Sequence, residues 1–424
     1  MEQKRKAGRN RRGRSKRRRE LQLRIELLAA VAVVLTIISI AVIQGSRARA
    51  EQEAREAAAQ TERIQKIRKS SEATPVPTEE PESGTVIQIR MVGDVILHED
   101  VCNSCLQNTG YQFDGLFCNI SGEIREADIA IANQETILGG TGLGITGWPE
   151  FNSPCEAGDA LVSAGFRVIL QASNHTLDYG IEGVTNCLNY WKTTHPEAAV
   201  LGIHGDRQAA EEIYVYEKDG FRVAILNYTY GTNLNEELLQ DENTAYLLNV
   251  LDEERVTADV ARAKEMADFV IVCPHWGIED DNNVCSEQQY WCDLFLSLGV
   301  DLVLGAHPHV IQPVEMKMGE NGHQMLVYYS LGNCVSNQEH AYAMVGAMAE
   351  VTIRKDQEGV HIDKYGIEPL VTHEGQNPQS FTTYLLRDYT EELAGSNGIL
   401  QDDSSFSLQY CQNLCREVFG NLYQ

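Results

Sequence analysis

Short apolar runs and amphipathic stretches take turns along residues 85–371, a pattern typical of a chain that forms strands and helices in alternation. Runs rich in Val, Ile and other strand-forming residues predict strands at 86–92, 129–132, 168–171, 223–228, 269–273, 302–304, 326–330, 347–353 and 360–369. Apolar residues at helical spacing predict helices near 121–127, 158–164, 184–194, 253–267 and 287–298. The alternation favours an α/β fold, a layered sandwich in which helices flank central β-sheets.

The longest apolar run lies outside that region, at residues 27–43, and contains no charged residue. Extended to 25–45, it is long enough to cross a bilayer. Residues 1–24 hold twelve Lys or Arg and two Glu, a net charge of +10 (12 − 2). Because a basic flank is retained on the cytoplasmic side, we predict a single-pass transmembrane helix at 25–45, with residues 1–24 in the cytoplasm and the domain outside the cell. A cleaved signal peptide is the alternative.

A polar segment separates this run from the alternating region. Residues 46–70 mix charges with Ala and Gln, which is typical of a solvated juxtamembrane helix. Residues 71–84 are rich in Pro and Glu, which predicts a flexible linker, so the folded domain is expected to span 85–371. Residues 372–424 have weak periodicity and form a C-terminal extension, either a packed helix or a tail.

The charge of the chain excludes one class of partner. The whole chain has a net charge of −26, so the part after residue 24 is near −36 (−26 − 10). An acidic body repels phosphate backbones, and the sequence has no basic patch interleaved with aromatic residues. We therefore expect no nucleic-acid partner.

The eleven cysteines leave two interpretations open. Outside the cytoplasm some could form disulfides, since Cys102 and Cys105, and likewise Cys411 and Cys415, are close in sequence. Alternatively, most are small apolar residues buried in the core. Cys102 and Cys105 alone do not make a zinc site, because no second cysteine pair follows at finger spacing.

Polar residues that can bind metal recur directly after the predicted strands. They are Asp94, Glu135, Asn174 with His175 and Asp178, His275 beside Trp276, His307 with His309, and Asn333. In open α/β sheets, sites form at the carboxyl ends of the strands, so we expect these side chains to meet at one edge. Their nitrogen and oxygen donors, without thiolate, favour Mn, Fe or Zn.

Taken singly, most of these residues also have an ordinary interpretation. Asp94 could be a turn residue, and Glu135 could be a surface carboxylate. His307 and His309 are the most specific pair, because in an extended conformation their side chains share one face and Pro308 restricts the backbone between them. The joint occurrence of such residues at successive strand ends favours a metal centre.

Six sequence pieces, in this order, resemble one known family. They are GDVIL at 93–97, ANQE at 132–135, SNHTLDYG at 173–180, PHWG at 274–277, GAHPHVIQP at 305–313 and YSLGN at 329–333. Together they resemble the CapA family of bacterial capsule and poly-γ-glutamate synthesis proteins, which is related to calcineurin-like metallophosphoesterases. The resemblance spans roughly residues 88–333 and implies a metallophosphatase-like domain anchored outside the cell membrane.

The resemblance also implies roles for individual residues. The metal ligands, for one or two divalent ions, would be Asp94, Glu135, Asn174, His275, His307 and His309, with Glu135 as the bridge. His175 would be the acid that protonates a leaving oxygen, and Asp178 would orient it. Trp276 and Asn333 would line the substrate site.

The first strand departs from the broader phosphoesterase pattern. That pattern has Asp-x-His at this point, whereas Ile96 stands two residues after Asp94. His98 lies two positions further on, and whether it reaches the site is open. The first metal position is therefore short of a ligand, and a single-metal or weakly occupied two-metal site is an alternative.

Two functions remain in competition. The first is a metal-dependent hydrolase or transferase of phosphoesterase type, acting on a phosphate ester or on an anionic polymer during export. The second is a non-enzymatic component of a capsule or poly-γ-glutamate synthesis complex, which binds polymer or stabilises the other synthesis proteins. The retained ligand set favours the first, and the missing first-strand histidine favours the second.

Overall fold

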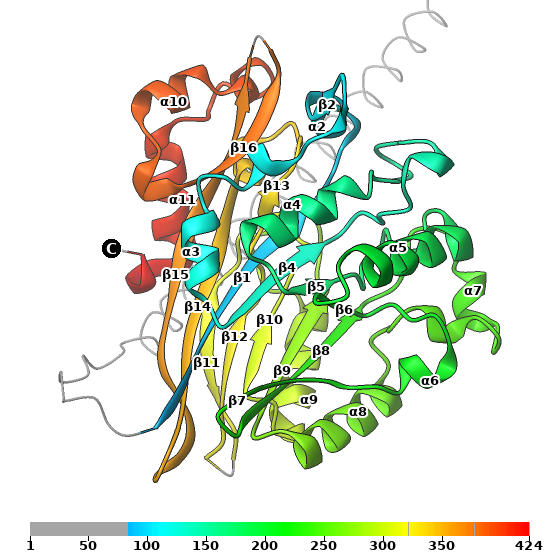
Figure 1. The fold of residues 1–424 in the computed structure, drawn as a ribbon. Coiled ribbons are helices and arrows are strands. Elements are labelled where there is room, and N and C mark those ends of the chain that lie inside the picture. The colour runs from blue at the N-terminus through cyan, green and yellow to red at the C-terminus, as the bar shows by residue number, and fades with distance from the viewer. Residues whose placement is uncertain (1–83, 321, 377, 424) are drawn as a thin grey trace, which may run out of the picture. The chain divides into compact units, whose positions relative to one another are not determined.

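The structure, a computed structural model, describes residues 84–320, 322–376 and 378–423 (Figure 1). The basic segment 1–24, the transmembrane helix predicted at 25–45 and the linker up to residue 83 lie outside the described residues. Across the described ranges, no helix combines the length and the apolar character that a bilayer crossing needs.

Two β-sheets form the centre of the domain. The first has eight strands in the order β16–β15–β14–β1–β4–β5–β6, with β13 paired to the end of β1. Its strands are β1 (Thr85–Val95), β4 (Ile129–Gln134), β5 (Val168–Leu170), β6 (Ala199–Leu201), β13 (Asn333–Val335), β14 (Val345–Asp356), β15 (Gly359–Gly375) and β16 (Ser380–Leu385).

The second sheet has six strands in the order β11–β12–β10–β9–β8–β7. Its strands are β7 (Tyr214–Lys218), β8 (Phe221–Thr229), β9 (Phe269–His275), β10 (Leu302–Leu304), β11 (Val314–Met318) and β12 (Gln324–Tyr328). A separate small hairpin pairs β2 (Leu106–Gln107) with β3 (Gly110–Tyr111).

Helices cover the outer faces of both sheets (Figure 1). The first sheet is covered by α2 (Glu99–Ser104), α3 (Ser121–Glu126), α4 (Glu156–Ala164) and α5 (Gly180–Thr194). The second is covered by α8 (Glu253–Met266) and α9 (Ser286–Leu298). The other helices are α6 (Arg207–Ala210), α7 (Glu237–Gln240), α10 (Glu391–Ser396) and α11 (Leu408–Phe419). This mixed α/β sandwich confirms the predicted fold class for the described residues.

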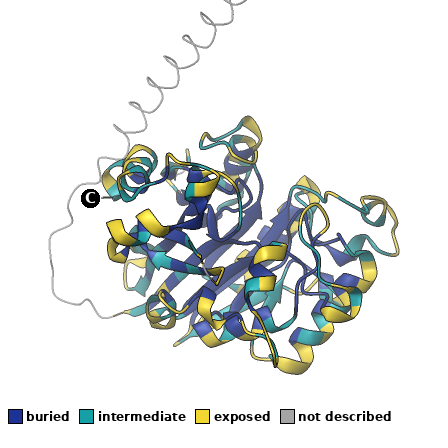
Figure 2. Cartoon of the chain, turned by 90° about the horizontal axis from the view of Figure 1, so that it is seen from above, coloured by how far each residue is buried: buried dark blue, intermediate teal, exposed yellow. Residues whose placement is uncertain are grey.

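The alternation of side chains along each strand divides the hydrophobic core. Ile87 and Ile89 of β1 face the second sheet, where they join Phe221 and Val223 of β8 in one cluster. Ala224, directly after Val223 on β8, faces the outer helices instead. Successive strand residues point to opposite faces, so apolar residues at both parities produce a sheet buried on both sides. Figure 2 shows the buried residues running through the middle of the sandwich, with exposed residues on the outer helices.

The outer helices follow from local sequence. Helix α8 begins after Asp252, whose carboxylate accepts a hydrogen bond from the Arg255 backbone N–H. Val256, Val260 and Ala263 then recur at spacings of four and three, so they share one face, and all three are buried. The helix therefore packs on the second sheet through this stripe.

The C-terminal extension is part of the same folded unit. Strand β15 runs through residue 371 to Gly375, so the expected boundary falls inside a strand. In α11, Cys411, Cys415 and Phe419 are spaced by four, are buried and join the core cluster between the sheets. The weak periodicity had left a packed helix and a tail equally open, and the packed helix is what forms.

The described residues include every cysteine of the chain, and none of these cysteines forms a disulfide. Most are buried, and burial raises the pKa of thiols such as Cys187 and Cys292 to about 12. A thiol with a raised pKa stays protonated and behaves as a small apolar side chain. The structure favours the core interpretation of the cysteines over the disulfide one.

The parallel strands bring their carboxyl ends to one edge. In the first sheet β1, β4, β5 and β6 run parallel, and in the second β8, β9, β10 and β12 do. Asn174, after β5, contacts His275, the last residue of β9. This contact shows that the two sets of strands end on the same side of the sandwich. Polar residues following these strands are therefore gathered from both sheets.

Candidate metal centre

The structure brings together all six residues that were expected to bind metal. They are Asp94 in β1, Glu135 after β4, Asn174 after β5, His275 at the end of β9, and His307 and His309 after β10. None of the six is more than 4% exposed. Polar side chains of this kind are rarely buried together unless they are paired or bind an ion.

Glu135 lies at the middle of the group. Its Oε1 is 3.8 Å from His275 Nε2 and 3.7 Å from His309 Nε2. His275 Nε2 is also 2.9 Å from Asn174 Oδ1, and His309 Nδ1 is 3.4 Å from Asp94 Oδ2. Two sets of donor atoms each lie within 4.8 Å of one another, and Glu135 belongs to both, as a bridging carboxylate would. The sets are Asp94, Glu135 and His275, and Glu135, His307 and His309.

Several donor atoms in this group lack a hydrogen-bond partner in the described protein. They are both carboxylate oxygens of Glu135, Nδ1 of His307 and Nδ1 of His309. A buried polar atom without a partner costs about 1–3 kcal/mol, and more when it is charged. Nitrogen and carboxylate donors at these spacings fit a divalent transition metal ion, which would satisfy them.

The carboxylates concentrate negative charge in a buried place. Burial raises the pKa of Glu135 well above its usual value, and Asp94 and Glu279 raise it further while His309 opposes them. Burial alone would lower the pKa of His309, but Glu135 and Asp94 raise it to about 10. The protein thus keeps one imidazolium beside its carboxylates, and a bound cation would take over that neutralising role.

The other two histidines are held in the neutral form. Burial lowers the pKa of His275 and of His307 well below the usual value, and neighbouring imidazoles add to the effect. Their ring centroids are 4.7 Å apart. A neutral imidazole has a free lone pair, which is the form that binds metal.

The backbone of the His307–His309 pair is not extended, which corrects the geometry expected from the sequence. Both residues have positive φ, 100° at His307 and 59° at His309, in a turn rather than a strand. Residues other than Gly rarely adopt such angles, and the strain is typically found at functional sites. Gly305 precedes the turn because a Cβ there would collide with the Tyr329 carbonyl.

Asp94 is held in place by two donors, one of which contacts both of its oxygens. Asn133 Nδ2 donates to Asp94 Oδ1 at 2.7 Å, and the His307 backbone N–H lies 3.2 and 3.1 Å from its two oxygens. Gly93 lets β1 approach the Gly332 carbonyl more closely than a Cβ would permit. The carboxylate is therefore oriented before any ligand arrives.

His175 and Asp178 form a pair beside the centre. His175 Nδ1 donates to Asp178 Oδ2 at 2.7 Å, and the Phe151 backbone N–H donates to the same oxygen, also at 2.7 Å. His175 Nε2 lies 3.4 Å from Asn233 Nδ2. The carboxylate holds the imidazole with Nε2 directed away from it, the arrangement that a proton donor requires.

Trp276 and Asn333 were expected to line the substrate site, but both side chains are buried. Trp276 is fully buried, its indole N–H donates to the Tyr329 carbonyl, and its ring packs on Phe295 in the core under α9. It supports the centre from behind and does not reach a ligand. Asn333 pairs with Asp94 across β1 and β13, and its amide nitrogen lies within 3.0 Å of three acceptors between residues 336 and 343.

The loop after β8 contributes residues that the sequence analysis missed. The Tyr230 ring lies 4.7 Å from the His307 ring, and Asn233 contacts His175. The strand before them was predicted, but its carboxyl end has no conspicuous His or Asp. The sequence could have indicated them in one way: the carboxyl end of the predicted strand should lie at the same edge of the sheets as the carboxyl ends of the other strands.

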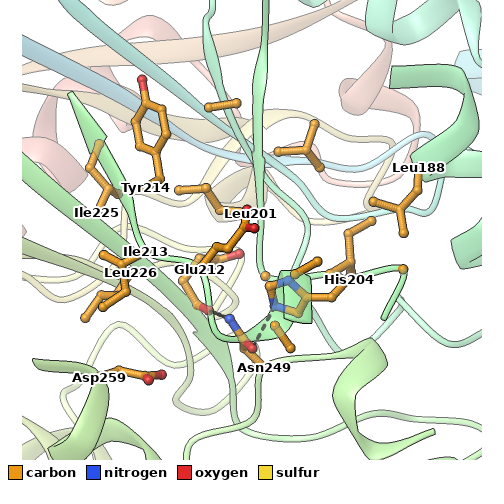
Figure 3. Close-up of a pocket in the computed structure, with 18 of the residues that line it drawn as sticks. Leu188, Leu201, His204, Glu212, Ile213, Tyr214, Ile225, Leu226, Asn249 and Asp259 are labelled. Atoms are coloured by element: carbon orange, nitrogen blue, oxygen red, sulfur yellow. Dashed lines mark hydrogen bonds between the residues drawn. The ribbon is translucent and has the colours of Figure 1, made fainter. Parts of the chain in front are cut away.

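Asn227 links the two sheets just behind the centre. It lies on the wall of a cavity of about 430 Å³ between β6 and β8, shown in Figure 3 with His204 bonded to Asn249. Asn227 Oδ1 accepts from the Ala172 N–H and its Nδ2 donates to the Cys273 carbonyl, both at 2.9 Å. These two partners each lie two residues before a member of the metal group, so Asn227 sets the separation of Asn174 and His275.

Replacing Asn227 with Asp is expected to weaken metal binding about 10- to 100-fold, as is usual for residues that support metal ligands. The variant keeps the acceptor for Ala172 but places a carboxylate oxygen against the Cys273 carbonyl, which also lowers stability by about 1–3 kcal/mol. Metal affinity by competition with a chelator and unfolding in urea measure the two effects. Asn108→Asp, on the exposed β2–β3 turn, makes the same charge change as a control. Unchanged metal affinity in the Asn227 variant would contradict this role.

The candidate metal centre lies within a region shared with a known protein family. Residues 88–338, more than half of the chain, match the family described as bacterial capsule synthesis protein PGA_cap. The chain belongs to this family. Its membership confirms the resemblance to CapA proteins that the ordered sequence pieces indicated.

Two relatives show the extent of the likeness. The chain is 27% identical over 219 residues to the PGA biosynthesis protein CapA of Bacillus subtilis (strain 168), covering 52% of this chain and 54% of that protein. It is 26% identical over 230 residues to the capsule biosynthesis protein CapA of Bacillus anthracis, covering 53% and 52%. The chain thus spans about half the length of the curated relatives it matches.

Solved structures also resemble the PGA_cap chain at low sequence identity. A hypothetical protein from Thermus thermophilus has 14% identity and a TM-score of 0.39, covering 67% of this chain and 98% of that one. The calcineurin-like phosphoesterase YfkN from Bacillus subtilis has 12% identity and a TM-score of 0.39, covering 77% and 100%.

Proposed function

We propose that this PGA_cap protein is a metal-dependent hydrolase of phosphoesterase type that acts in the synthesis or export of a capsule or poly-γ-glutamate polymer. The observation that carries the proposal is the buried Glu135 carboxylate. Its two oxygens have no hydrogen-bond partner among the described residues, and its Oε1 lies 3.8 Å from His275 Nε2 and 3.7 Å from His309 Nε2. Such an arrangement is costly unless a cation binds it. The names of the CapA relatives supply the polymer context.

The candidate ligands would hold one or two divalent ions through Asp94, Glu135, Asn174 and the three histidines. When bound, such an ion would polarise a phosphoryl oxygen and lower the pKa of water. The chain's own contribution is orientation: Asn133 and the His307 N–H hold Asp94, and Asn174 holds His275. Side chains held in this way need little rearrangement when a metal ion binds.

His175 would protonate the leaving oxygen. Its Nδ1 is bonded to Asp178, which stabilises the charged ring, so the proton to be transferred sits on Nε2. The pair is buried, with each residue 6% exposed, which limits exchange of that proton with bulk water. Departure of an alkoxide from phosphorus would thus be assisted by a proton from His175.

The proposed location is the outer side of the cell membrane, with residues 25–45 as a single-pass anchor and the N-terminus in the cytoplasm. The support is the uncharged apolar run and the +10 charge of residues 1–24 that precede the domain (12 − 2). At that location the partners would be the other polymer synthesis proteins, and the substrate an anionic polymer or a phosphoester.

One observation favours a second function, that of a non-enzymatic component of the synthesis complex. Ile96 occupies the position where phosphoesterases place a histidine ligand, and it is 3% exposed within the core. The Ile96 side chain has no donor atom and cannot bind metal. A centre weakened in this way could stabilise the fold or hold polymer without hydrolysing it.

Metal analysis and a hydrolysis assay separate the two functions. We expect the full-length chain in detergent to retain a transition metal and to hydrolyse bis(p-nitrophenyl) phosphate. His307→Ala should lose bound metal and lower hydrolysis by more than about 100-fold, because the ion stabilises the transition state by several kcal/mol. His361→Ala, at a half-buried histidine of β15, is the matched control. A wild-type chain without metal and without activity would contradict the enzyme and support the structural component.

A further inference from the structure

His98 follows β1 and directly precedes α2, four residues after Asp94. Its imidazole packs against the Phe151 ring, which also contacts the ring of His175 beside the candidate metal centre. Burial, with smaller effects of His309 and His175, lowers the pKa of His98 to about 4, against the Ile96 carbonyl, which raises it. The ring is therefore neutral at physiological pH, and it still has some exposed surface.

The orientation of the ring is set by neighbours on two sides. The Asn337 backbone N–H donates to His98 Nδ1 at 3.1 Å, which places the ring's own proton on Nε2. The Phe151 ring packs edge-on against His98 at 5.4 Å and against His175 at 4.6 Å. Phe151 is itself fixed through its N–H to Asp178. His98, Phe151 and His175 thus form one connected wall beside the metal centre.

A neutral donor is useful at this place because of the charges around it. The largest charges acting on Glu135 and His309 come from other carboxylates and imidazoles. A phosphate group that enters meets this negative field, and each hydrogen-bond donor that faces it offsets part of the repulsion. An Nε2–H fixed in direction by Asn337 offers one at no cost of reorganisation.

We propose that His98 is a substrate-binding residue of the same centre, whose Nε2–H donates a hydrogen bond to a non-bridging oxygen of a phosphoryl group. This inference rests on the proposed phosphoesterase function. It gives His98 a role in binding substrate rather than metal. Together with His175, it would place two imidazoles along one side of the phosphoryl group.

Binding of inorganic phosphate to the zinc-loaded, full-length chain tests the role without relying on turnover. We expect His98→Phe to weaken phosphate binding by about 10- to 100-fold in calorimetry, as for loss of a hydrogen bond to a charged group, while zinc content stays at the wild-type level. His98→Gln retains an amide donor and should lose less affinity than His98→Phe. His361→Gln, which changes a half-buried histidine of β15, should bind phosphate as the wild type does.

A second measurement reports the tautomer directly. In protein labelled with ¹⁵N at histidine, we expect the His98 resonance, assigned by its loss in His98→Gln, to show the Nε2–H form and to shift when phosphate is added. Three outcomes would overturn the role: a His98→Phe variant that binds phosphate normally, one that loses zinc, or an Nδ1–H tautomer. Failure of zinc-loaded wild type to bind phosphate would overturn the phosphoesterase proposal as well, whereas normal binding by both wild type and variant overturns only this one.

Discussion

His175→Asn is expected to lower the hydrolysis of phosphodiesters with poor leaving groups by about 10²- to 10⁴-fold, the usual contribution of a general acid. Asn cannot supply a proton to an alkoxide, whereas p-nitrophenolate leaves without one. The loss should therefore be large for an alkyl ester and small for bis(p-nitrophenyl) phosphate. The comparison of kcat for the two substrates, with metal content measured on the same samples, gives the answer.

The control for this change uses a second histidine–carboxylate pair. His195 follows the last residue of α5, and its Nε2 lies 2.7 Å from Asp159 Oδ1. His195→Asn therefore breaks the same kind of pair away from the centre. It should leave both rates unchanged. An equal loss for both substrates in His175→Asn, or loss of metal from that variant, would rule out the acid role.

The metal-free protein is expected to lose stability as the pH falls from about 6.5 to 5, because His275 and His307 stay neutral in the fold. Their pKa values are lowered well below 6.5 by burial, so in this window the unfolded chain takes up protons that the folded chain refuses. Each such histidine lowers the free energy of unfolding by about 1.4 kcal/mol per pH unit. His307→Asn should reduce the slope by about that amount.

Two other groups of the centre also have shifted pKa values, His309 and Glu135. His309, with its pKa raised to about 10, contributes stability that is complete below pH 6.5 and is lost only as the pH rises toward 10. Glu135, with a raised pKa, gives a slope of the opposite sign. The test is therefore the difference between the slopes of wild type and His307→Asn, and not either slope by itself. Urea unfolding at pH 5 and 6.5, with chelator present, measures both slopes. His361→Asn, at a half-buried histidine of β15, is the control. A slope in His307→Asn equal to that of wild type would contradict a buried neutral imidazole.

The helices and strands nearest the centre were predictable because their apolar residues are continuous. Strand β10 was predicted at its observed bounds, 302–304, since Leu302, Val303 and Leu304 are all apolar and a parallel strand is buried on both faces. Strands β6 and β7 were missed because they are short edge strands whose residues are mostly half-buried. Their place in the sheet depends on neighbours that are distant in sequence.

What the sequence alone determined about this protein is the composition of the centre: which residues follow each strand, and that they are nitrogen and oxygen donors. That much is local, because a residue after a buried strand must emerge at the edge of the sheet.

Only the tertiary structure decided which of these side chains meet. Glu135 reaches both His275 and His309 because two sheets end on the same side. Trp276, adjacent to His275, points into the core because successive residues face opposite ways. The left-handed turn at His307 and His309 is likewise held by Gly305 packing on Tyr329, a contact between separate strands that no local pattern encodes.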